Sequence, residues 1–168
     1  SALDYAHLKG IVHRDIKPAN VLLRSQSDVI ELGKPLPADV EPILTDFGLV
    51  RLLDSTMHTT AGSVSGTPAY MSPEQARGLT DEVDVRSDVY SLGVIFYELL
   101  TNQLPYDVSR TSFPQAVQII CDQPPLRSSA ISKSLRGDLE TIAFKALEKD
   151  PERRYASVAS LAEDIERF

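Results

Sequence analysis

The sequence predicts a mainly α-helical domain that contains one small pair of β-strands. Apolar residues recur at spacings of three and four along much of the second half of the chain, which is the period of a helix with a buried face. Two brief apolar runs, residues 21–23 and 42–44, are flanked by polar or turn residues, as short strands usually are. A chain of 168 residues, 42% of them hydrophobic and 24% charged, can bury one sizeable core, so we expect a single domain.

The first half of the chain is expected to consist mostly of connections around those two strands. Residues 1–9 are interpreted as the end of a helix that Gly10 terminates. Residues 25–42 hold three prolines and a glycine, which favours a surface loop, either a tolerated insertion or a docking element. Residues 46–77 are rich in Ser, Thr and Gly with little helical period, so they are expected to form a loop. The apolar side of the first helix is expected to be Leu3, Tyr5 and Ala6, and the first loop has room for a short strand about Val29 and Ile30.

Helices are expected to dominate the second half. Residues 87–101 are apolar on nearly every side, which predicts a central buried helix. Residues 114–122 predict a shorter helix, because a proline in the first turn lacks only an amide that would be unpaired there. Apolar spacing predicts an amphipathic helix over residues 135–149, which Asp150 and Pro151 end, and a last helix that runs to the C-terminus.

Composition excludes several classes of protein. The 17 basic and 24 acidic residues give a formal net charge of −7, which argues against a broad nucleic-acid surface. The single cysteine, Cys121, excludes an internal disulfide and a multi-cysteine zinc site, and is expected to be a small buried group on a helix. The longest apolar run, residues 92–100, includes Glu98 and is shorter than the ~20 residues of a membrane span, so no membrane segment is predicted in this chain. His7 and His58 are not expected to be ligands.

One short segment and one remote aspartate carry the strongest chemical signal. The segment "HRDIKPAN" contains Asp15, Lys17 and Asn20, and Asp46 follows a predicted strand. Phosphoryl transfer needs a carboxylate that orients the attacking hydroxyl and takes its proton, oxygen ligands for magnesium, and positive charge on the moving group. An aspartate or asparagine alone is most often a turn residue. The combination and its order favour phosphoryl transfer.

These motifs closely resemble those of the eukaryotic-type serine/threonine protein kinases, in the form found in bacteria. "HRDIKPAN" (residues 13–20) is similar to the catalytic loop, "DFG" (46–48) to the magnesium loop, and "SPE" (72–74) to the Ala-Pro-Glu motif with one substitution. "SDVYSLG" (87–93) resembles the start of the central helix and "KDPERR" (149–154) the turn before the last helix. The resemblance covers residues 1–168 in the family's order. It implies the C-terminal lobe of a kinase domain, mainly α-helical, with a small strand pair beside the catalytic loop.

The resemblance implies specific roles at the site. Asp15 would be the catalytic base, and Asn20 and Asp46 would bind the magnesium ions that bridge the phosphates of ATP. Lys17 would contact the γ-phosphate, and "DIKP" is similar to the serine/threonine-specific form of the motif. Thr67 would hydrogen-bond to Asp15 and Lys17 and so complete the substrate site. The cofactors implied are ATP and Mg²⁺, and the partners are protein substrates.

Other matched residues would have packing or regulatory roles. Kinases with an arginine directly before the catalytic aspartate, here Arg14, are typically activated by phosphorylation of the loop that follows, and we expect Thr59 or Thr60 to be the main site. The remaining matches are Leu22 beneath the adenine ring, His13 and Phe47 stacked in an internal hydrophobic column, Asp88 holding the catalytic-loop backbone, and Glu74 paired with Arg154 in a buried ion pair.

The sequence contains no glycine-rich phosphate loop, β3 lysine or partner glutamate, which are parts of the small N-terminal lobe that clamp ATP. We therefore expect an N-lobe to be encoded upstream, and the chain to be inactive without it while exposing apolar surface, including Leu22. The alternative is a silent kinase-like lobe that acts as a binding module. Small-molecule phosphotransferases share a similar catalytic loop but lack the "SPE" segment and its arginine partner, so they rank lower. The resemblance implies a cytoplasmic kinase portion and leaves open a membrane anchor elsewhere in the full-length protein.

Overall fold

The computed structural model describes residues 2–25, 35–47, 68–131 and 137–168, and their fold is mainly helical, as predicted. Along the chain, the α-helices are α1 (Ala2–Leu8), α2 (Pro73–Ala76), α3 (Val85–Thr101), α4 (Phe113–Asp122), α5 (Ser128–Ile131), α6 (Asp138–Ala146) and α7 (Val158–Glu166). Short 3₁₀ helices span Pro18–Asn20, Pro68–Tyr70, Thr80–Glu82 and Pro151–Arg153. Strands β1 (Val21–Arg24) and β2 (Glu41–Leu44) form the one sheet in the described part of the chain.

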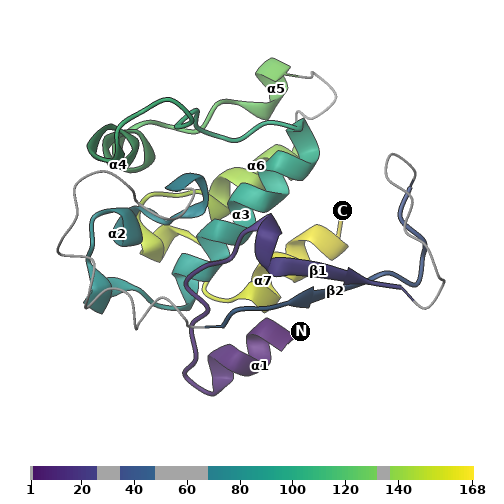
Figure 1. The fold of residues 1–168 in the computed structure, drawn as a ribbon. Coiled ribbons are helices and arrows are strands. Elements are labelled where there is room, and N and C mark those ends of the chain that lie inside the picture. Colours follow the sequence, from purple (N-terminus) through teal and green to yellow (C-terminus); the bar gives the residue numbers. More distant parts are fainter. Residues whose placement is uncertain (1, 26–34, 48–67, 132–136) are drawn as a thin grey trace.

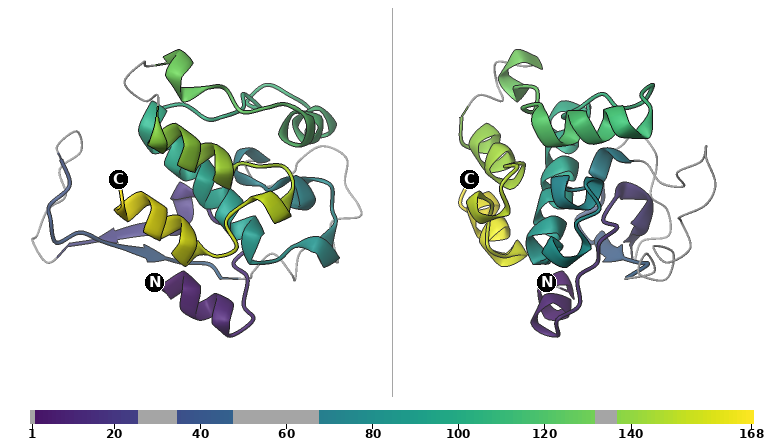
Figure 2. Two further views of the ribbon diagram at one scale, coloured as in Figure 1. Left: turned by 180° about the vertical axis from the view of Figure 1, so that it is seen from behind. Right: turned by 90° about the vertical axis from the view of Figure 1, so that its left-hand side faces the viewer.

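Helix α3 is the centre of the fold. The Asp84 side chain accepts from the backbone N–H of Arg86 at its start, and Asn102 ends it in the left-handed conformation. Helices α6 and α7 lie on one side of α3 and the strand pair lies on the other (Figure 2). The predicted central buried helix is thus confirmed, although it begins two residues earlier than residue 87.

Two clusters of buried side chains pack against α3. One lies between α3 and α4 and contains Tyr90, Val94, Tyr97, Tyr106, Ala116, Ile120, Cys121 and Leu147. The other joins α1, α6 and α7 to the base of the catalytic segment and contains Leu3, Ile16, Val89, Ile142, Ala146, Tyr155, Val158 and Leu161. Cys121 is buried, as expected, and its thiol donates to the carbonyl of Pro73 at 3.6 Å. Core packing therefore surrounds α3 and reaches the segment that carries Asp15.

Strands β1 and β2 confirm the predicted pair, each one residue longer than the apolar run. They are antiparallel, with Val21 opposite Leu44 at one end and Arg24 opposite Glu41 at the other. The hairpin projects away from the helices (Figure 1), which leaves the Leu22 and Leu23 side chains about half exposed. The strand suggested about Val29 and Ile30 lies outside the described residues.

Several sequence predictions were wrong in detail. Tyr5 is 64% exposed, whereas Leu3 and Ala6 are buried. Leu3 and Ala6 are three residues apart and so share one face of the helix, and Tyr5 lies on another face. Residues 68–76, expected to belong to a loop, form a 3₁₀ turn and helix α2, which a capping box between Ser72 and Gln75 starts. Helix α5 was not predicted, and α6 starts at Asp138. None of the described helices is long and apolar enough to cross a membrane.

Candidate active site

The catalytic segment, residues 13–20, is fixed to the start of α3 by one buried carboxylate. Asp88 is 1% exposed and accepts at 2.8 Å from the backbone N–H groups of His13 and Arg14. Arg14 has a φ of 70°, in the left-handed region that non-glycine residues rarely occupy. Such a conformation costs on the order of 1–3 kcal/mol and persists only where neighbouring groups fix it. Asp88 is one of those groups, in agreement with the role predicted for it.

The Asp15 carboxylate is held by two side chains from its own segment. Lys17 Nζ donates to Asp15 Oδ2 at 2.8 Å, and Asn20 Nδ2 donates to the same oxygen at 3.0 Å and to the Asp15 carbonyl at 2.8 Å. The 3₁₀ helix Pro18–Asn20 turns the chain so that Asn20 faces back toward Asp15. No hydrogen bond to Asp15 Oδ1 is formed by the described residues, so this oxygen can accept a proton from a hydroxyl.

A second segment joins the site through Thr45 and Phe47. The backbone N–H of Thr45 donates to the Asn20 carbonyl at 2.9 Å, which places the residue before Asp46 against the catalytic segment. His13 is fully buried, and its Nε2 donates to the Thr45 carbonyl at 2.8 Å while its Nδ1 accepts from the Asp15 amide at 3.3 Å. The ring centroids of His13 and Phe47 lie 4.6 Å apart with the ring planes tilted by 53°, so the two rings are in contact, as predicted, but are not stacked in parallel. The structure therefore brings together the two segments that the motifs singled out.

Asn20 and Asp46 provide oxygen atoms suited to magnesium. Asn20 uses its amide nitrogen in the bonds to Asp15, which leaves its amide oxygen for a cation. Asp46 is exposed, with a φ of 62°, and its carboxylate forms no hydrogen bond or ion pair with the described residues. Mg²⁺ prefers such hard oxygen ligands and keeps several waters or phosphate oxygens as its other ligands. These two residues fit the predicted ion.

The buried ion pair predicted from the motifs is present. Arg154 NH1 and NH2 donate to the two carboxylate oxygens of Glu74, each at 2.8 Å. The remaining Arg154 donors reach the carbonyls of Glu148, Arg86 and Lys149, and Ser87 donates to Glu74 at 2.6 Å. Burial alone would raise the pKa of Glu74, but the hydrogen bonds and charge of Arg154, with Ser87, outweigh it and hold that pKa below its usual value. The pair anchors α2 to the turn before α7.

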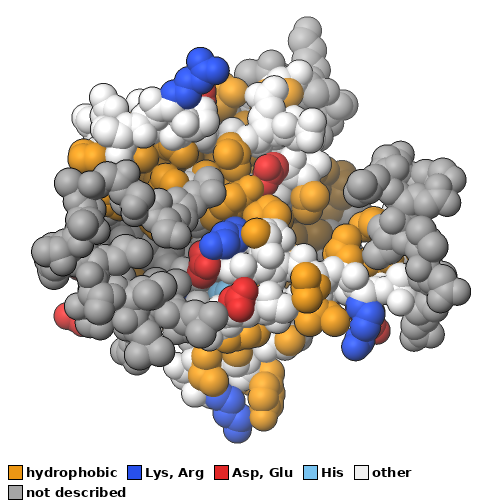
Figure 3. Space-filling model, viewed as in Figure 1, with side chains coloured by type: hydrophobic (Ala, Val, Ile, Leu, Met, Phe, Trp, Pro, Cys, Tyr) orange, Lys and Arg blue, Asp and Glu red, His pale blue; other side chains and the backbone are white. Residues whose placement is uncertain are grey.

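Several apolar side chains in and just after α1 and in β1 are exposed. Leu8 is 84% exposed, Leu22 55%, Ile11 48% and Leu23 46%. Figure 3 shows hydrophobic side chains over α1 and the strand pair. A lone exposed leucine needs no explanation, whereas several on one face usually mark a contact surface. Leu22, predicted to lie beneath an adenine ring, belongs to this group.

Two residues that support the site were not predicted from the sequence. His7 Nε2 donates to Asp88 Oδ2 at 2.8 Å, so the histidine that was given no role holds the carboxylate that holds the catalytic segment. Gln75 Nε2 donates to the Arg14 carbonyl at 2.7 Å from helix α2. Neither contact has a local sequence signal, because its partners are 81 and 61 residues apart. The predicted residues Thr59, Thr60 and Thr67 lie outside the described part of the chain.

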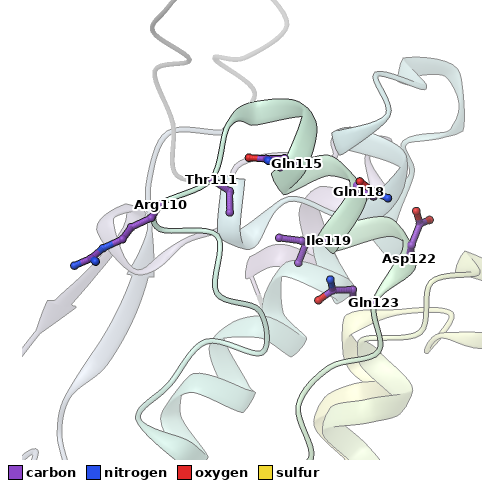
Figure 4. A pocket seen from close by; sticks show the side chains of 7 residues that line it. All are labelled: Arg110, Thr111, Gln115, Gln118, Ile119, Asp122 and Gln123. Carbon is purple, nitrogen blue, oxygen red and sulfur yellow. The ribbon is translucent and has the colours of Figure 1, made fainter.

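An open pocket of about 480 Å³ lies beside α4, lined by Arg110, Thr111, Gln115, Gln118, Ile119, Asp122 and Gln123 (Figure 4). Four of these residues, Gln115, Gln118, Ile119 and Asp122, belong to α4 itself. The pocket shares no residue with the catalytic segment. It is therefore separate from the candidate active site.

Comparison with known proteins agrees with this geometry. Residues 1–164 match the family model described as the protein kinase domain. The chain is 39% identical over 167 residues to serine/threonine-protein kinase PknB of Mycobacterium leprae and 41% identical over 162 residues to Pkn1 of Myxococcus xanthus. These matches cover 99% and 95% of the chain but only 24% and 21% of the two relatives. The solved kinase domain of Mycobacterium tuberculosis PknI superposes with a TM-score of 0.64 at 28% identity, over 99% of this chain and 50% of that one. The chain therefore belongs to the protein kinase domain family, and its fold is that of the C-terminal lobe.

Proposed function

We propose that this chain is the C-terminal lobe of a serine/threonine protein kinase, which transfers the γ-phosphoryl group of ATP to hydroxyl groups of protein substrates. The observation that carries the proposal is the hydrogen bonding of the two Asp15 carboxylate oxygens. One oxygen is fixed by Lys17 and Asn20, and the other forms no hydrogen bond with the described residues. The names of the relatives, which are serine/threonine-protein kinases, support the same reaction class.

Each residue then has a distinct task. Asp15 Oδ1 orients the serine or threonine hydroxyl and accepts its proton, a contribution usually worth about 10²–10⁴ in rate. Lys17 places its positive charge beside Asp15, where charge develops on the transferred phosphoryl group. Asn20 and Asp46 hold Mg²⁺ through their side-chain oxygens, and Mg²⁺ when bound neutralises phosphate charge. Thr67, which lies outside the described residues, is the residue to which the resemblance assigns the substrate side of the site.

We further propose that this lobe works with a small N-terminal lobe that packs over the exposed apolar face. Leu22, 55% exposed, would lie beneath the adenine ring and would be covered by the N-terminal lobe. Covering such side chains contributes about 25 cal/mol per Å² of apolar surface removed from water. Without the N-lobe, the 168-residue chain is expected to self-associate, which light scattering can measure. A monodisperse monomer would count against the proposed contact between the two lobes.

The activity test compares the 168-residue chain with a longer chain that adds the proposed N-terminal lobe. The measurement is phosphotransfer from labelled Mg-ATP to a generic protein substrate. Asp15→Asn and Asp46→Ala are made in both chains, because each removes one proposed task. Activity in the longer chain alone, abolished by either substitution, is the expected result. Activity that survives both substitutions would overturn the proposed roles, and no activity in either chain would favour a binding module.

Regulation is proposed to act through Arg14. None of the described residues forms an ion pair with its guanidinium group, and a phosphate adds about −1.5 to −2 charges at neutral pH. Phosphorylation of Thr59 or Thr60 would supply that partner and order the loop against the catalytic segment. Mass spectrometry of the active longer chain should find one of the two modified. If both are unmodified in fully active protein, this form of regulation is wrong.

A further inference from the structure

Two helices of this chain begin with the same side-chain motif. At the start of α2, Gln75 Oε1 accepts from the backbone N–H of Ser72 at 3.0 Å and from its hydroxyl at 3.1 Å. At the start of α4, Gln115 Oε1 accepts from the N–H and hydroxyl of Ser112 at 3.1 and 3.0 Å. Both are capping boxes, which stabilise the first turn of a helix. Their local contributions to stability should therefore be similar.

The two glutamines differ in what their amide nitrogen contacts. Gln75 Nε2 donates to the Arg14 carbonyl at 2.7 Å, whereas Gln115 lines the open pocket beside α4 (Figure 4). The orientation of the Gln75 amide is fixed by its partners. Its oxygen faces the N–H of Ser72 and its nitrogen faces a carbonyl, so the reverse orientation would set donor against donor and acceptor against acceptor. Gln75 is thus a bridge between α2 and the catalytic segment.

The carbonyl that Gln75 contacts belongs to the peptide group that joins Arg14 to Asp15. The N–H of Arg14 is already fixed by Asp88 at 2.8 Å, so Asp88 and Gln75 hold Arg14 from both sides. Arg14 is also the residue with the left-handed φ of 70°. Fixing both its N–H and its C=O sets the direction in which the chain enters Asp15. Loss of the Gln75 contact would leave the Arg14–Asp15 peptide group held only through its N–H, which donates to His13 Nδ1 at 3.3 Å, and would ease its rotation toward a less strained conformation.

Helix α2 can serve as a rigid support for this contact. Glu74, next to Gln75, is buried and paired with Arg154 through two bonds of 2.8 Å. Ala76 and Pro73 on the same short helix are also buried. The Gln75 side chain therefore extends from a fixed backbone, and movement of α2 would be transmitted to the Arg14 carbonyl.

We propose that Gln75 is a positioning residue for the catalytic base, acting through the Arg14–Asp15 peptide group. This inference rests on the proposed function, because it assigns Gln75 a part in orienting Asp15. The link from α2 to the catalytic segment is the hydrogen bond from Gln75 Nε2 to the Arg14 carbonyl. Its effect should appear in kcat with little change in the KM for ATP, because Gln75 contacts none of the proposed ATP or magnesium ligands.

The test uses matched substitutions in the longer chain that contains the proposed N-terminal lobe. Gln75→Glu keeps the oxygens that accept from Ser72 but sets an oxygen against the Arg14 carbonyl, and Gln75→Met removes both groups without adding charge. Gln115→Glu and Gln115→Met make the same changes at the other capping box. Displacement of a reacting group by about 1 Å can reduce a rate by about 10²-fold, so we expect both Gln75 variants to lose about 10- to 100-fold in kcat. Both Gln115 variants should stay within about twofold of the unsubstituted chain.

Two readouts separate this inference from the proposed function. Hydrogen exchange of the backbone around Asp15 should accelerate in Gln75→Met and not in Gln115→Met, whether or not the protein transfers phosphate. A chain that is active and sensitive to Asp15→Asn, but whose Gln75 and Gln115 variants have equal kcat, would overturn the positioning role alone. Absence of phosphotransfer in the unsubstituted chain would overturn the proposed function, and the exchange result would still decide whether Gln75 holds the segment.

Discussion

Arg154 donates to both carboxylate oxygens of Glu74 at 2.8 Å, across 80 residues of sequence, with the Arg154 side chain fully buried. All five of its N–H donors have partners, two on Glu74 and three on backbone carbonyls. The guanidinium also lies 5.0 Å from the centre of the Tyr90 ring. Such a planar, fully bonded group can be replaced by neither a lysine nor an apolar side chain without leaving donors or acceptors unpaired.

Removal of one partner of this pair should be strongly destabilising. Arg154→Ala and Glu74→Ala are each expected to lower the free energy of unfolding by about 3–5 kcal/mol, because each leaves a buried charge without its partner. Chemical denaturation provides the measurement. The exposed pair between Arg24 and Glu41 is the control, and Arg24→Ala should cost less than about 1 kcal/mol. Equal costs at the two sites would show that burial is not what makes the Glu74 pair important.

His7 should stabilise the start of α3 through Asp88. His7→Leu removes the donor to Asp88 Oδ2 and is expected to cost about 1–3 kcal/mol, while His7→Gln, whose amide nitrogen can take the place of Nε2, should recover part of that loss. Tyr5→Leu on the same helix changes an exposed side chain and should alter stability by about 0.5 kcal/mol or less. If His7→Leu unfolds at the same denaturant concentration as Tyr5→Leu, the bond to Asp88 contributes nothing.

Lys149 should give stability a distinctive dependence on pH. Its Nζ lies 4.0 Å from the Tyr106 ring centre and donates to the Tyr106 hydroxyl at 2.7 Å and to the Ile120 carbonyl. Burial lowers its pKa from 10.5 to about 8, and the nearby Arg154 adds to the shift. Between those two values the unfolded chain binds more protons than the folded one, so this residue makes stability rise with pH from about 8 toward 10.5.

Thermal unfolding of the unsubstituted protein and of Lys149→Met at a series of pH values tests this sign. The melting temperature of the unsubstituted protein, relative to that of the variant, should increase between about pH 8 and pH 9.5. The comparison cancels the titration of groups remote from Lys149, whereas the titration of Cys121, whose pKa the Lys149 charge lowers, changes with the substitution. A difference that stays constant, or that falls as pH rises, would contradict the lowered pKa.

Gly93 permits the close contact of α3 with α6. A Cβ at this position would lie 2.7 Å from the Ala146 Cβ and 3.3 Å from its carbonyl carbon. Gly93→Ala improves helix propensity by about 1 kcal/mol, yet the clash should make the net change destabilising by about 1–2 kcal/mol. The double variant Gly93→Ala, Ala146→Gly should recover part of this loss, as a double-mutant cycle of unfolding free energies can measure. Absence of any coupling between the two positions would show that the helices separate without cost.

Much of the fold could be predicted because its signals are local. The apolar pattern after residue 85 identified α3, α4 and α7, and the runs at residues 21–23 and 42–44 identified both strands. Helix α2 and the short α5 were missed because four-residue helices have too little periodicity to detect. The Ser72 to Gln75 capping box was a usable signal for α2 that was not applied.

The candidate site was predictable where its residues are close together in the chain. Asp15, Lys17 and Asn20 lie within six residues, so their order in the chain is itself the motif, and in the fold hydrogen bonds join them, which the sequence did not predict. His7 and Gln75 contribute through contacts with residues 81 and 61 positions away, and no pattern in one sequence encodes such a distance. The sequence therefore predicts the reacting side chains of one short segment, whereas the residues that hold this segment in place are found only in the fold.

The Asp88 carboxylate has a consequence for the order in which this lobe matures during synthesis. It holds His7 and His13, 81 and 75 residues earlier in the chain, and α2 is locked only when Arg154 has been made. Chains grow from the N-terminus at about 5–20 residues per second, so the catalytic segment leaves the ribosome several seconds before the residues that shape it. During that interval the nascent chain carries every catalytic side chain in unformed geometry. The geometry of the catalytic segment therefore forms late in synthesis. A nascent chain that stalls before Arg154 would lack the ion pair that fixes α2.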